Sequence, residues 1–257
     1  MKKNHFLALC LSLFVVGNSF GWGKTGHRVV GQIAEWHLSN KALKNIGQIL
    51  GPESLAMSAN WMDEIRSDNA YSYTYTWHYL TVHEGRGYQP ELQEKDGDAY
   101  EVMQKLIDEL KNHPLSDNKK AENIRMLVHI VGDLHQPLHV GTGEDKGGNE
   151  VDVYYFNQKT NLHTVWDSKI IDHQQLSFTE WSAHLNRRAD QKTVDKLQAA
   201  PFSQWLSEAV QLRAIVYNLP ESKRLSYRYD YETVSIIEER LLAGGIRLAG
   251  ILNDIYG

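Results

Sequence analysis

The chain has 257 residues, of which 42% are hydrophobic and 23% are charged, and its formal net charge is −5. This acidic balance argues against a basic protein that follows the phosphates of a nucleic acid by charge alone. It does not exclude a phosphate substrate held by metal, because bound divalent ions can be the largest local charges in a site.

The first 21 residues have the pattern of a secretory signal peptide. Two lysines precede the apolar run from Phe6 to Val16, and residues 19–21 form a small-x-small cleavage site. The apolar run is too short to span a membrane comfortably, so we expect no membrane anchor. Cleavage after Gly21 predicts an exported protein, periplasmic or secreted, that begins at Trp22.

The remaining residues 22–257 are enough for one sizeable core and too few for a convincing pair of domains. The only cysteine of the sequence, Cys10, lies within the expected signal peptide. The mature chain must therefore be held by its core, by metal, or by both. We expect a single domain, a monomer with no obligate protein partner.

The hydrophobic pattern predicts three helices before the first aromatic segment. The first covers residues 25–38 with Thr25 as its N-cap, and the second covers 41–50 and ends at Gly51. A third short helix is expected over 59–67. Residues 71–82 are rich in Tyr, Thr and Trp, which is typical of either a strand or an extended aromatic segment.

The rest of the chain is also predicted to be mainly helical. The expected helices cover residues 98–110, 117–134, 179–189, 203–217 and 231–255. Residues 141–149 form a Gly-rich loop, and the alternating residues 151–156 predict a strand that pairs with the next segment in a small hairpin. The fold class is therefore all-α, a single mainly helical domain with one small β-hairpin.

Two histidine–aspartate pairs share one spacing in the middle of the chain. His129 precedes Asp133 by four residues, as His163 precedes Asp167. At 3.6 residues per turn this spacing places an imidazole and a carboxylate on one face of a helix. A further imidazole, His139, comes after a proline that should end or kink the first helix. Imidazole and carboxylate are ligands of zinc, so the repeated pair favours a metal site.

The complete set of candidate ligands is larger than one metal ion needs. It comprises Trp22, His27, Asp63, His78, His129, Asp133, His139, His163 and Asp167. Nine groups are too many for one tetrahedral zinc and fit three ions if one carboxylate bridges two of them. Trp22 joins the set only through its main-chain amine and carbonyl, and that amine exists only after the signal peptide is cleaved.

Six motifs carry a resemblance to a known family. They are WGxxGH at residues 22–27, DxxR at 63–66, WHY at 77–79, HxxGDxHQPLH at 129–139, GGN at 147–149 and NLHxxWD at 161–167. Together and in this order, they are similar to the S1/P1 nucleases, extracellular zinc-dependent enzymes related in fold to the bacterial zinc-dependent phospholipases C. The resemblance covers essentially the whole mature chain.

The resemblance implies three zinc ions and assigns the ligands to each of them. The implied sets are Asp63, His78, His129 and Asp133 for the first ion, Trp22, His27 and the shared Asp133 for the second, and His139, His163 and Asp167 for the third. Asp63 would also orient or deprotonate the attacking water, and Arg66 would bind the phosphate in the transition state.

The resemblance also implies the substrates. The family cleaves single-stranded RNA and DNA to 5′-phosphate products and removes 3′-phosphates from nucleotides. Tyr79 would stack on a base and Asn149 would line the base pocket. Thr81 stands where fungal members carry an aspartate, so their base preference does not transfer. The mature chain lacks the disulfides of eukaryotic members, which indicates a bacterial branch.

Other interpretations remain open from the sequence. A zinc-dependent phospholipase C would use the same three ions, and a periplasmic protein could hold zinc for purely structural reasons. Arg66 could simply form an i, i+3 salt bridge with Asp63. Tyr79 could be a core residue, and Asn149 could be a turn residue after two glycines.

Overall fold

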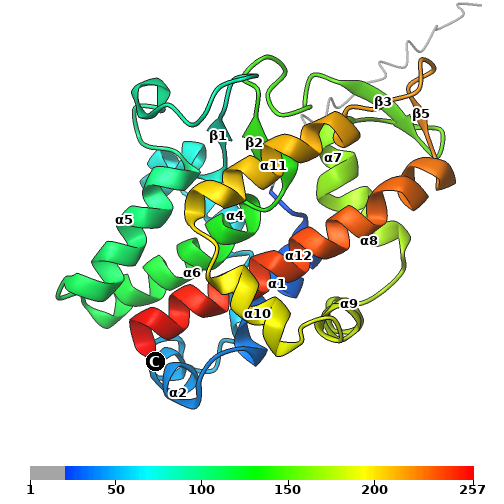
Figure 1. Ribbon diagram of the computed structural model, residues 1–257. Helices are drawn as coiled ribbons and strands as arrows, with labels where there is room; N and C mark the ends of the chain where they lie inside the picture. Colours follow the sequence, from blue (N-terminus) through cyan, green and yellow to red (C-terminus); the bar gives the residue numbers. More distant parts are fainter. Residues whose placement is uncertain (1–20) are drawn as a thin grey trace, which may run out of the picture.

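A computed structural model describes residues 21–257 of the chain, most of which lie in helices (Figure 1). The signal peptide predicted over residues 1–21 lies, apart from Gly21, outside the described residues. The α-helices in chain order are α1 (Lys24–Trp36), α2 (Asn40–Leu50), α3 (Leu55–Ser58), α4 (Trp61–Glu64), α5 (Ala99–Asn112), α6 (Asp117–Asp133), α7 (Leu162–Thr164), α8 (Ile170–His173), α9 (Phe178–Asn186), α10 (Gln191–Gln198), α11 (Phe202–Val216) and α12 (Tyr227–Tyr256). The predicted class, a mainly helical domain, is confirmed.

Helix α6 is the centre of the packing. Every residue from Met126 to Asp133 is buried, which is typical of a helix enclosed on all sides. Helices α1, α4, α5 and α12 contact it, and Figure 1 shows it between α5 and α12. The last two turns of this buried helix carry His129 and Asp133, so both side chains are placed inside the protein.

The long helix α12 supports α6 and α1 from one side. Gly244 and Gly245 of α12 face Val30 and Ile33 of α1. Because glycine has no side chain, the two helices can pack closely at this point. Both helices are buried along this contact. The N-terminal helix α1 is therefore fixed against the core directly after the expected cleavage site.

Two small sheets complete the fold. Strand β1 (Leu80–Thr81) pairs in parallel with β2 (Val140–Gly141), and the buried Arg213 of α11 donates to the carbonyl of Val82 and to that of Val140 at 2.8 Å each. Strand β3 (Asp152–Tyr155) pairs with β4 (Gln158–Asn161) in the predicted antiparallel hairpin. A short strand that was not predicted, β5 (Arg224–Leu225), joins β3 in parallel.

Several expected elements are corrected by the structure. Residues 71–82 are mostly not a strand, since they continue a 3₁₀ segment, η2 (Asn69–His78). Asp68 begins this segment by accepting from the N–H of Ala70, so local hydrogen bonding outweighs the β-propensity of Tyr and Thr. Thr25 does not cap α1, because Gly23 holds the N-cap position. The sequence also did not predict α10.

Shorter 3₁₀ and π segments connect the helices near the paired histidines and aspartates. They are η1 (Ile65–Ser67), η3 (Pro90–Leu92), η4 (Pro137–His139) and the π-helical turn η5 (Val165–Lys169). Helix α6 ends at Asp133, and the proline that was expected to break it instead begins η4. His139 is thereby carried out of the line of α6, as the sequence indicates.

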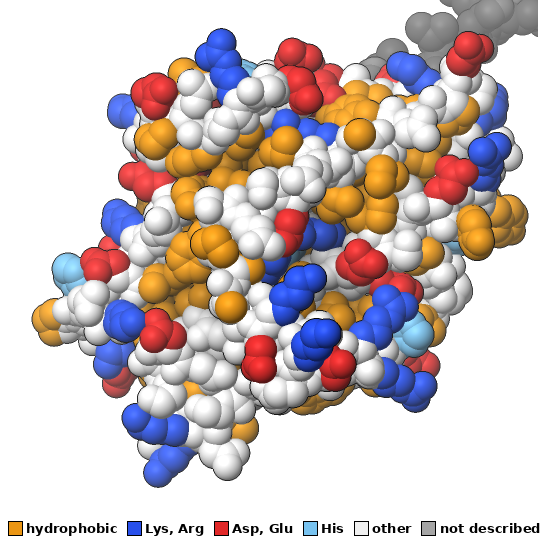
Figure 2. Space-filling model, in the orientation of Figure 1, with side chains coloured by type: hydrophobic (Ala, Val, Ile, Leu, Met, Phe, Trp, Pro, Cys, Tyr) orange, Lys and Arg blue, Asp and Glu red, His pale blue; other side chains and the backbone are white. Residues whose placement is uncertain are grey.

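The surface carries both signs of charge. Acidic and basic side chains are interspersed over the face seen in Figure 2, with apolar patches between them. Among the described residues, no helix combines the length and the apolarity that crossing a bilayer requires.

A buried ion network joins α11 to α12. Glu208 accepts from Arg240 at 2.6 Å and from Arg247 at 2.7 Å, and both arginines are at most 5% exposed. Burial works against the ionised form of Glu208, but the hydrogen bonds from Arg247 and Arg240 outweigh it and lower its pKa to about 2. A carboxylate with a lowered pKa stabilises the fold above its ordinary pKa of 4.5, and this stabilisation is lost as the pH falls toward 2.

We therefore expect Glu208→Gln to lower the free energy of unfolding at pH 7 by about 3–5 kcal/mol, because two buried guanidinium groups lose their counter-charge. Urea unfolding measures this, and the difference from wild type should shrink below pH 4.5. Glu232→Gln is the matched control, since its partner Arg228 lies on the surface. Equal effects of the two substitutions would contradict the role of Glu208.

Candidate metal centre

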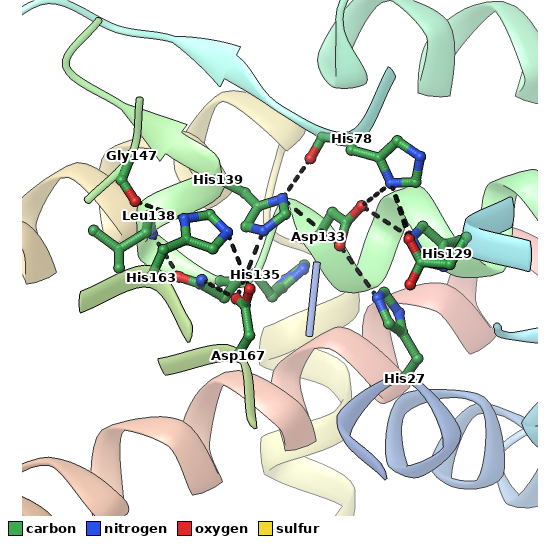
Figure 3. Close-up of polar contacts among 12 residues, drawn as sticks. His27, His78, His129, Asp133, His135, Leu138, His139, Gly147, His163 and Asp167 are labelled. Carbon is green, nitrogen blue, oxygen red and sulfur yellow. Dashed lines mark hydrogen bonds and ion pairs between the residues drawn. The ribbon is translucent and has the colours of Figure 1, made fainter. Parts of the chain in front are cut away.

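The predicted ligands converge from many elements on the end of α6, as Figure 3 shows around Asp133. They come from α1 (His27), α4 (Asp63), η2 (His78), α6 (His129, Asp133), η4 (His139), α7 (His163) and η5 (Asp167). All of these side chains are buried, with at most 8% exposure. Burial of so many imidazoles and carboxylates requires a strong compensating interaction.

Four candidate ligand atoms form a cage at the end of α6. His129 Nε2 lies 3.1 Å from His78 Nδ1 and 3.3 Å from Asp133 Oδ2, while His78 Nδ1 lies 3.2 Å from the same oxygen. Asp63 Oδ1 lies 3.7 Å from His129 Nε2 and 3.9 Å from His78 Nδ1. The edges of a zinc tetrahedron are about 3.4 Å for bonds of about 2.0–2.1 Å. The cage therefore has the size of a single tetrahedral ion.

Asp133 faces two groups of histidines at once. While Oδ2 closes the cage just described, Oδ1 lies 3.3 Å from Nε2 of His27 and 3.7 Å from Nδ1 of His139. The ring of His27 stacks on that of His129, with centroids 3.8 Å apart. One carboxylate thus connects two neighbouring ligand groups, which is the geometry of a bridge between two ions.

A further ligand group lies beyond His139. Nε2 of His163 is 3.0 Å from Asp167 Oδ2, and Nε2 of His139 is 3.7 Å from Asp167 Oδ1. His163 and Asp167 were expected one turn apart on an α-helix; the structure places Asp167 in the π-helical turn η5 instead. Such π turns are frequent at functional sites, and here the turn still directs both groups to one point.

Main-chain carbonyls fix the orientation of three imidazoles. His129 Nδ1 donates to Ala59 O at 2.7 Å, and His163 Nδ1 donates to Gly147 O at 2.6 Å. His139 Nδ1 lies 2.5 Å from the carbonyl of His78. This arrangement leaves each Nε2 facing the centre and is common around metal-binding histidines.

The charges of the centre are strongly coupled. Burial opposes the charged form of His129, but the carboxylates of Asp133 and Asp63 outweigh it and raise its pKa to about 9. Burial also opposes the charged form of His139, but the carboxylates of Asp133 and Asp167 outweigh it and raise the pKa of His139 to about 9. Asp133 stays ionised, because His129 and His139 overcome the effect of burial and hold its pKa well below the ordinary value. A metal ion bound here would compete with protons for both histidines.

The buried donor and acceptor atoms support a metal directly. Within residues 21–257, several have no hydrogen-bond partner, namely Nε2 of His27, His139 and His163, and Oδ1 of Asp63 and Asp133. Buried polar atoms are nearly always paired, so a cluster of inward-facing exceptions needs a partner of another kind. Three groups are close enough to share an ion: His27, His129 and Asp133; Asp63, His78 and His129; and His139, His163 and Asp167. The donor set fits divalent metal, with imidazole and carboxylate only.

The main chain before α1 enters the same centre. Trp22 is fully buried, and the N–H of Gly23 donates to the carbonyl of Asp167 at 2.7 Å. A Cβ at Gly21 would lie only 1.7 Å from Asp133 Oδ1 and 2.9 Å from His27 Nε2. The chain at Gly21 therefore passes directly beside the carboxylate of Asp133.

The residues predicted to act on the substrate lie at the edge of the centre. Arg66 Nη1 is 4.0 Å from Asp63 Oδ1, and the Arg66 guanidinium lies 4.9 Å from the ring centre of Tyr75. Tyr79 is half-buried at the end of η2. The side-chain amide of Asn149 donates to the carbonyl of Lys146, which is the contact of a turn residue.

Two residues outside the predicted ligand set also shape the centre. Gln136 is fully buried, donates to Asp167 Oδ1 at 2.6 Å and accepts from the N–H of Leu138. Gly132 allows the ring of His27 to approach α6, since a Cβ there would meet Nδ1 of His27 at 2.9 Å. Both residues stand inside the HxxGDxHQPLH motif, which is the signal that could have identified them.

His135 lies in the same motif but belongs to the ion network of α12. Its Nδ1 donates to Val131 O, and its Nε2 accepts from Arg247 at 2.9 Å. Burial, together with Arg240 and Arg247, lowers its pKa well below the ordinary value. His135 is therefore a neutral structural histidine, outside the three ligand groups found among the described residues.

A buried centre of histidines and aspartates on a helical scaffold defines a metal-dependent class of protein, and comparison with known proteins defines the family. Residues 22–257 match the family described as S1/P1 Nuclease. Endonuclease 2 of Arabidopsis thaliana is 30% identical over 95% of this chain and 94% of its own length. Nuclease P1 of Penicillium citrinum is 28% identical over 92% and 98%, and Nuclease S1 of Aspergillus oryzae is 29% identical over 59% and 55%. The chain belongs to the S1/P1 nuclease family.

The hydrogen bond from Gln136 to Asp167 should orient this carboxylate for metal binding. We expect Gln136→Met to weaken metal binding in the group of His139, His163 and Asp167 by about 10–100-fold, because Asp167 loses the donor that orients it. Zinc titration of metal-stripped protein measures this. Gln104→Met, on the exposed face of α5, is the control. Wild-type affinity in the Gln136 variant would show that Asp167 needs no such support.

Proposed function

We propose that this protein is an exported zinc-dependent phosphodiesterase that hydrolyses single-stranded DNA and RNA to 5′-phosphate products and also acts as a 3′-nucleotidase. Residues 1–21 are the signal peptide and residues 22–257 the nuclease domain, a monomer in the periplasm or outside the cell. The single observation that carries the proposal is the bridging position of Asp133 between two groups of buried histidines. Membership of the S1/P1 nuclease family supports the reaction class.

The ligand groups fit three zinc ions. We assign Asp63, His78, His129 and Asp133 to the first ion, the amine and carbonyl of Trp22 with His27 and Asp133 to the second, and His139, His163 and Asp167 to the third. The cage around His129 Nε2 supports the first assignment by its size. The approach of the chain at Gly21 to Asp133 supports the second, and the contacts of Asp167 support the third.

Zinc, when bound, supplies hydroxide near neutral pH and neutralises charge on the phosphate and on the leaving oxygen. The protein's own groups position the reactants. Asp63 lies at the rim of the cage and would orient the water or take its proton, and Arg66 beside it would direct its planar fork to the phosphate. The walls of the centre are buried, so these charges act with little screening by solvent.

Base recognition falls to residues outside the ligand groups. The half-buried Tyr79 offers a ring for stacking, and its hydroxyl stays protonated because burial, Glu94 and Tyr75 raise its pKa to about 12. Stacking accepts any base, and a duplex hides the faces that stacking needs, which favours single strands. Asn149 would line the same pocket through its side-chain oxygen, since its amide is turned to Lys146.

The experiment that tests the proposed function compares two substrates. Purified protein that begins at Trp22 is loaded with zinc and incubated with denatured DNA and with phosphatidylcholine vesicles. We expect 5′-phosphorylated fragments from the DNA and no release from the lipid. Release from lipid alone would replace the nuclease by a phospholipase C. Hydrolysis of neither substrate, with fold lost on chelation, would make the ions structural.

The bridging role proposed for Asp133 can be tested through the metal content of the protein. We expect Asp133→Ala to lose two ions together, since one carboxylate serves both, whereas Asp167→Ala should lose one. Elemental analysis of the purified variants gives the stoichiometry, with circular dichroism as the check on folding. Loss of a single ion from Asp133→Ala would contradict the bridging role.

The phosphate-binding role proposed for Arg66 can be tested through the rate of catalysis. We expect Arg66→Ala to lower kcat on single-stranded DNA by about 10²–10³-fold, the usual effect of removing one donor to developing charge. Its zinc content should equal that of the wild type, because Arg66 contacts the phosphate and ligates no ion. A fall in zinc content would instead give Arg66 a structural role beside Asp63.

A further inference from the structure

A hollow of about 500 Å³ opens beside the metal centre on the side of Arg66. Asp63 and Arg66 form its inner wall, and Tyr71, Tyr75, Ser67 and Ser72 are among the residues that line the rest. Two residues assigned to catalysis therefore also line the hollow. A nucleoside fits within this volume, and the lining is aromatic and hydroxyl-rich.

One wall of the hollow is rigid. The hydroxyl of Tyr71 donates to Glu122 at 3.1 Å, and its ring meets the ring of Trp61 edge-on with centroids 5.5 Å apart. The hydroxyl of Thr74 donates to the carbonyl of Tyr71 at 2.8 Å and fixes the backbone of η2. The shape of this wall is therefore set by packing before any ligand arrives.

The other wall is the pair formed by Tyr75 and Arg66. The Tyr75 side chain is 58% exposed, although it stands on the rim of a buried centre. The Arg66 guanidinium lies over its ring at 4.9 Å, so a flat aromatic surface and a flat cation stand together. Single-stranded nucleic acids stack their bases on surfaces of this kind.

The charges of the hollow favour a base over a phosphate. Asp63 and Glu64 are both among the residues that line the hollow, and their negative charge would disfavour a second phosphate group there. The carboxylate of Glu64 can accept hydrogen bonds from the edge of a base, and the nearby hydroxyls can accept or donate them. The occupant is therefore a nucleobase, held by stacking and by hydrogen bonds at its edge.

The proposed reaction indicates which of the two nucleosides beside the scissile phosphate carries this base. In forming a 5′-phosphate, the oxygen of water bonds to phosphorus while the bond from phosphorus to the 3′-oxygen breaks, and that oxygen leaves as a hydroxyl. The nucleoside that keeps the 3′-hydroxyl is the one stacked on Tyr79, because a 3′-nucleotide contains only this nucleoside. The other nucleoside keeps the phosphate and must lie on the far side of it.

We propose that the hollow between Tyr71 and Tyr75 is a second base-binding site, which takes the base of the nucleotide that leaves with the 5′-phosphate. This inference rests on the proposed nuclease function and adds a binding site to it. Tyr75 and Arg66 form its stacking surface, and Arg66 stands between this base and the scissile phosphate. The site favours strands over mononucleotides, since a 3′-nucleotide has no base to place in it.

The test uses zinc-loaded protein, a dinucleoside monophosphate and the matching 3′-mononucleotide. We expect Tyr75→Ala to raise KM for the dinucleotide more than for the mononucleotide, by a factor between about 5 and about 150, the range for stacking one base on a ring. Tyr75→Phe should keep the wild-type ratio, because the ring face remains. A dinucleotide with an abasic second residue should lose the effect of Tyr75→Ala.

Tyr231→Ala is the matched control, as Tyr231 is an exposed tyrosine of α12 that is not among the residues lining the hollow. Zinc content and circular dichroism show that each variant is folded. Equal losses on both substrates would mean that Tyr75 acts only through Arg66, and no loss on either would mean that the hollow takes no base; both overturn the proposal. Failure of the wild type to cleave either nucleotide would instead overturn the proposed function itself.

Discussion

The structure depends on one buried charge, the carboxylate of Asp133. It is fully enclosed at the end of α6, and each of its oxygens faces a different group of imidazoles. A lone carboxylate in such a place would be very costly, so positive charge must accompany it. Without metal, Asp133 and its neighbouring carboxylates raise the pKa of His129 and of His139, which favours the protonated imidazoles that would supply that charge. Divalent ions would supply more of it and would also satisfy the unpartnered ligand atoms.

The fold arranges everything else around that carboxylate. Helix α6 is packed against α1, α2, α3, α4, α5 and α12, so its last turns are held within the core. The β1–β2 pair, held by Arg213, fixes the segment after His78 to the segment after His139. Carbonyl acceptors then set the angle of each imidazole. The candidate ligands are thereby preorganised, and Tyr71 and Tyr75 of η2 line a hollow that Asp63 also lines.

The sequence predicted the parts that depend on local spacing. The i, i+4 pair of His129 and Asp133 lies on one helix as expected, and the hairpin after residue 151 is confirmed. The parts that depend on distant contacts were not predicted. Residues 71–82 were expected to be a strand or an extended segment, but most of them belong to the 3₁₀ segment η2. The role of Gln136 becomes visible only when Asp167 of η5 is brought beside it. The hollow at Tyr75 is lined by residues 63–75 alone, and its shape depends on the 3₁₀ segments η1 and η2, which the sequence did not predict.

We propose that the amine of Trp22 joins five imidazoles and three aspartates around three ions. The most direct measurement is the number of zinc ions bound per chain by protein that begins at Trp22 and by protein that carries Gly21 before it. We expect three ions in the first and fewer in the second, where an amide replaces the amine beside Asp133. Equal stoichiometry would show that Trp22 is not a ligand, and an empty centre in the first protein would contradict the whole account.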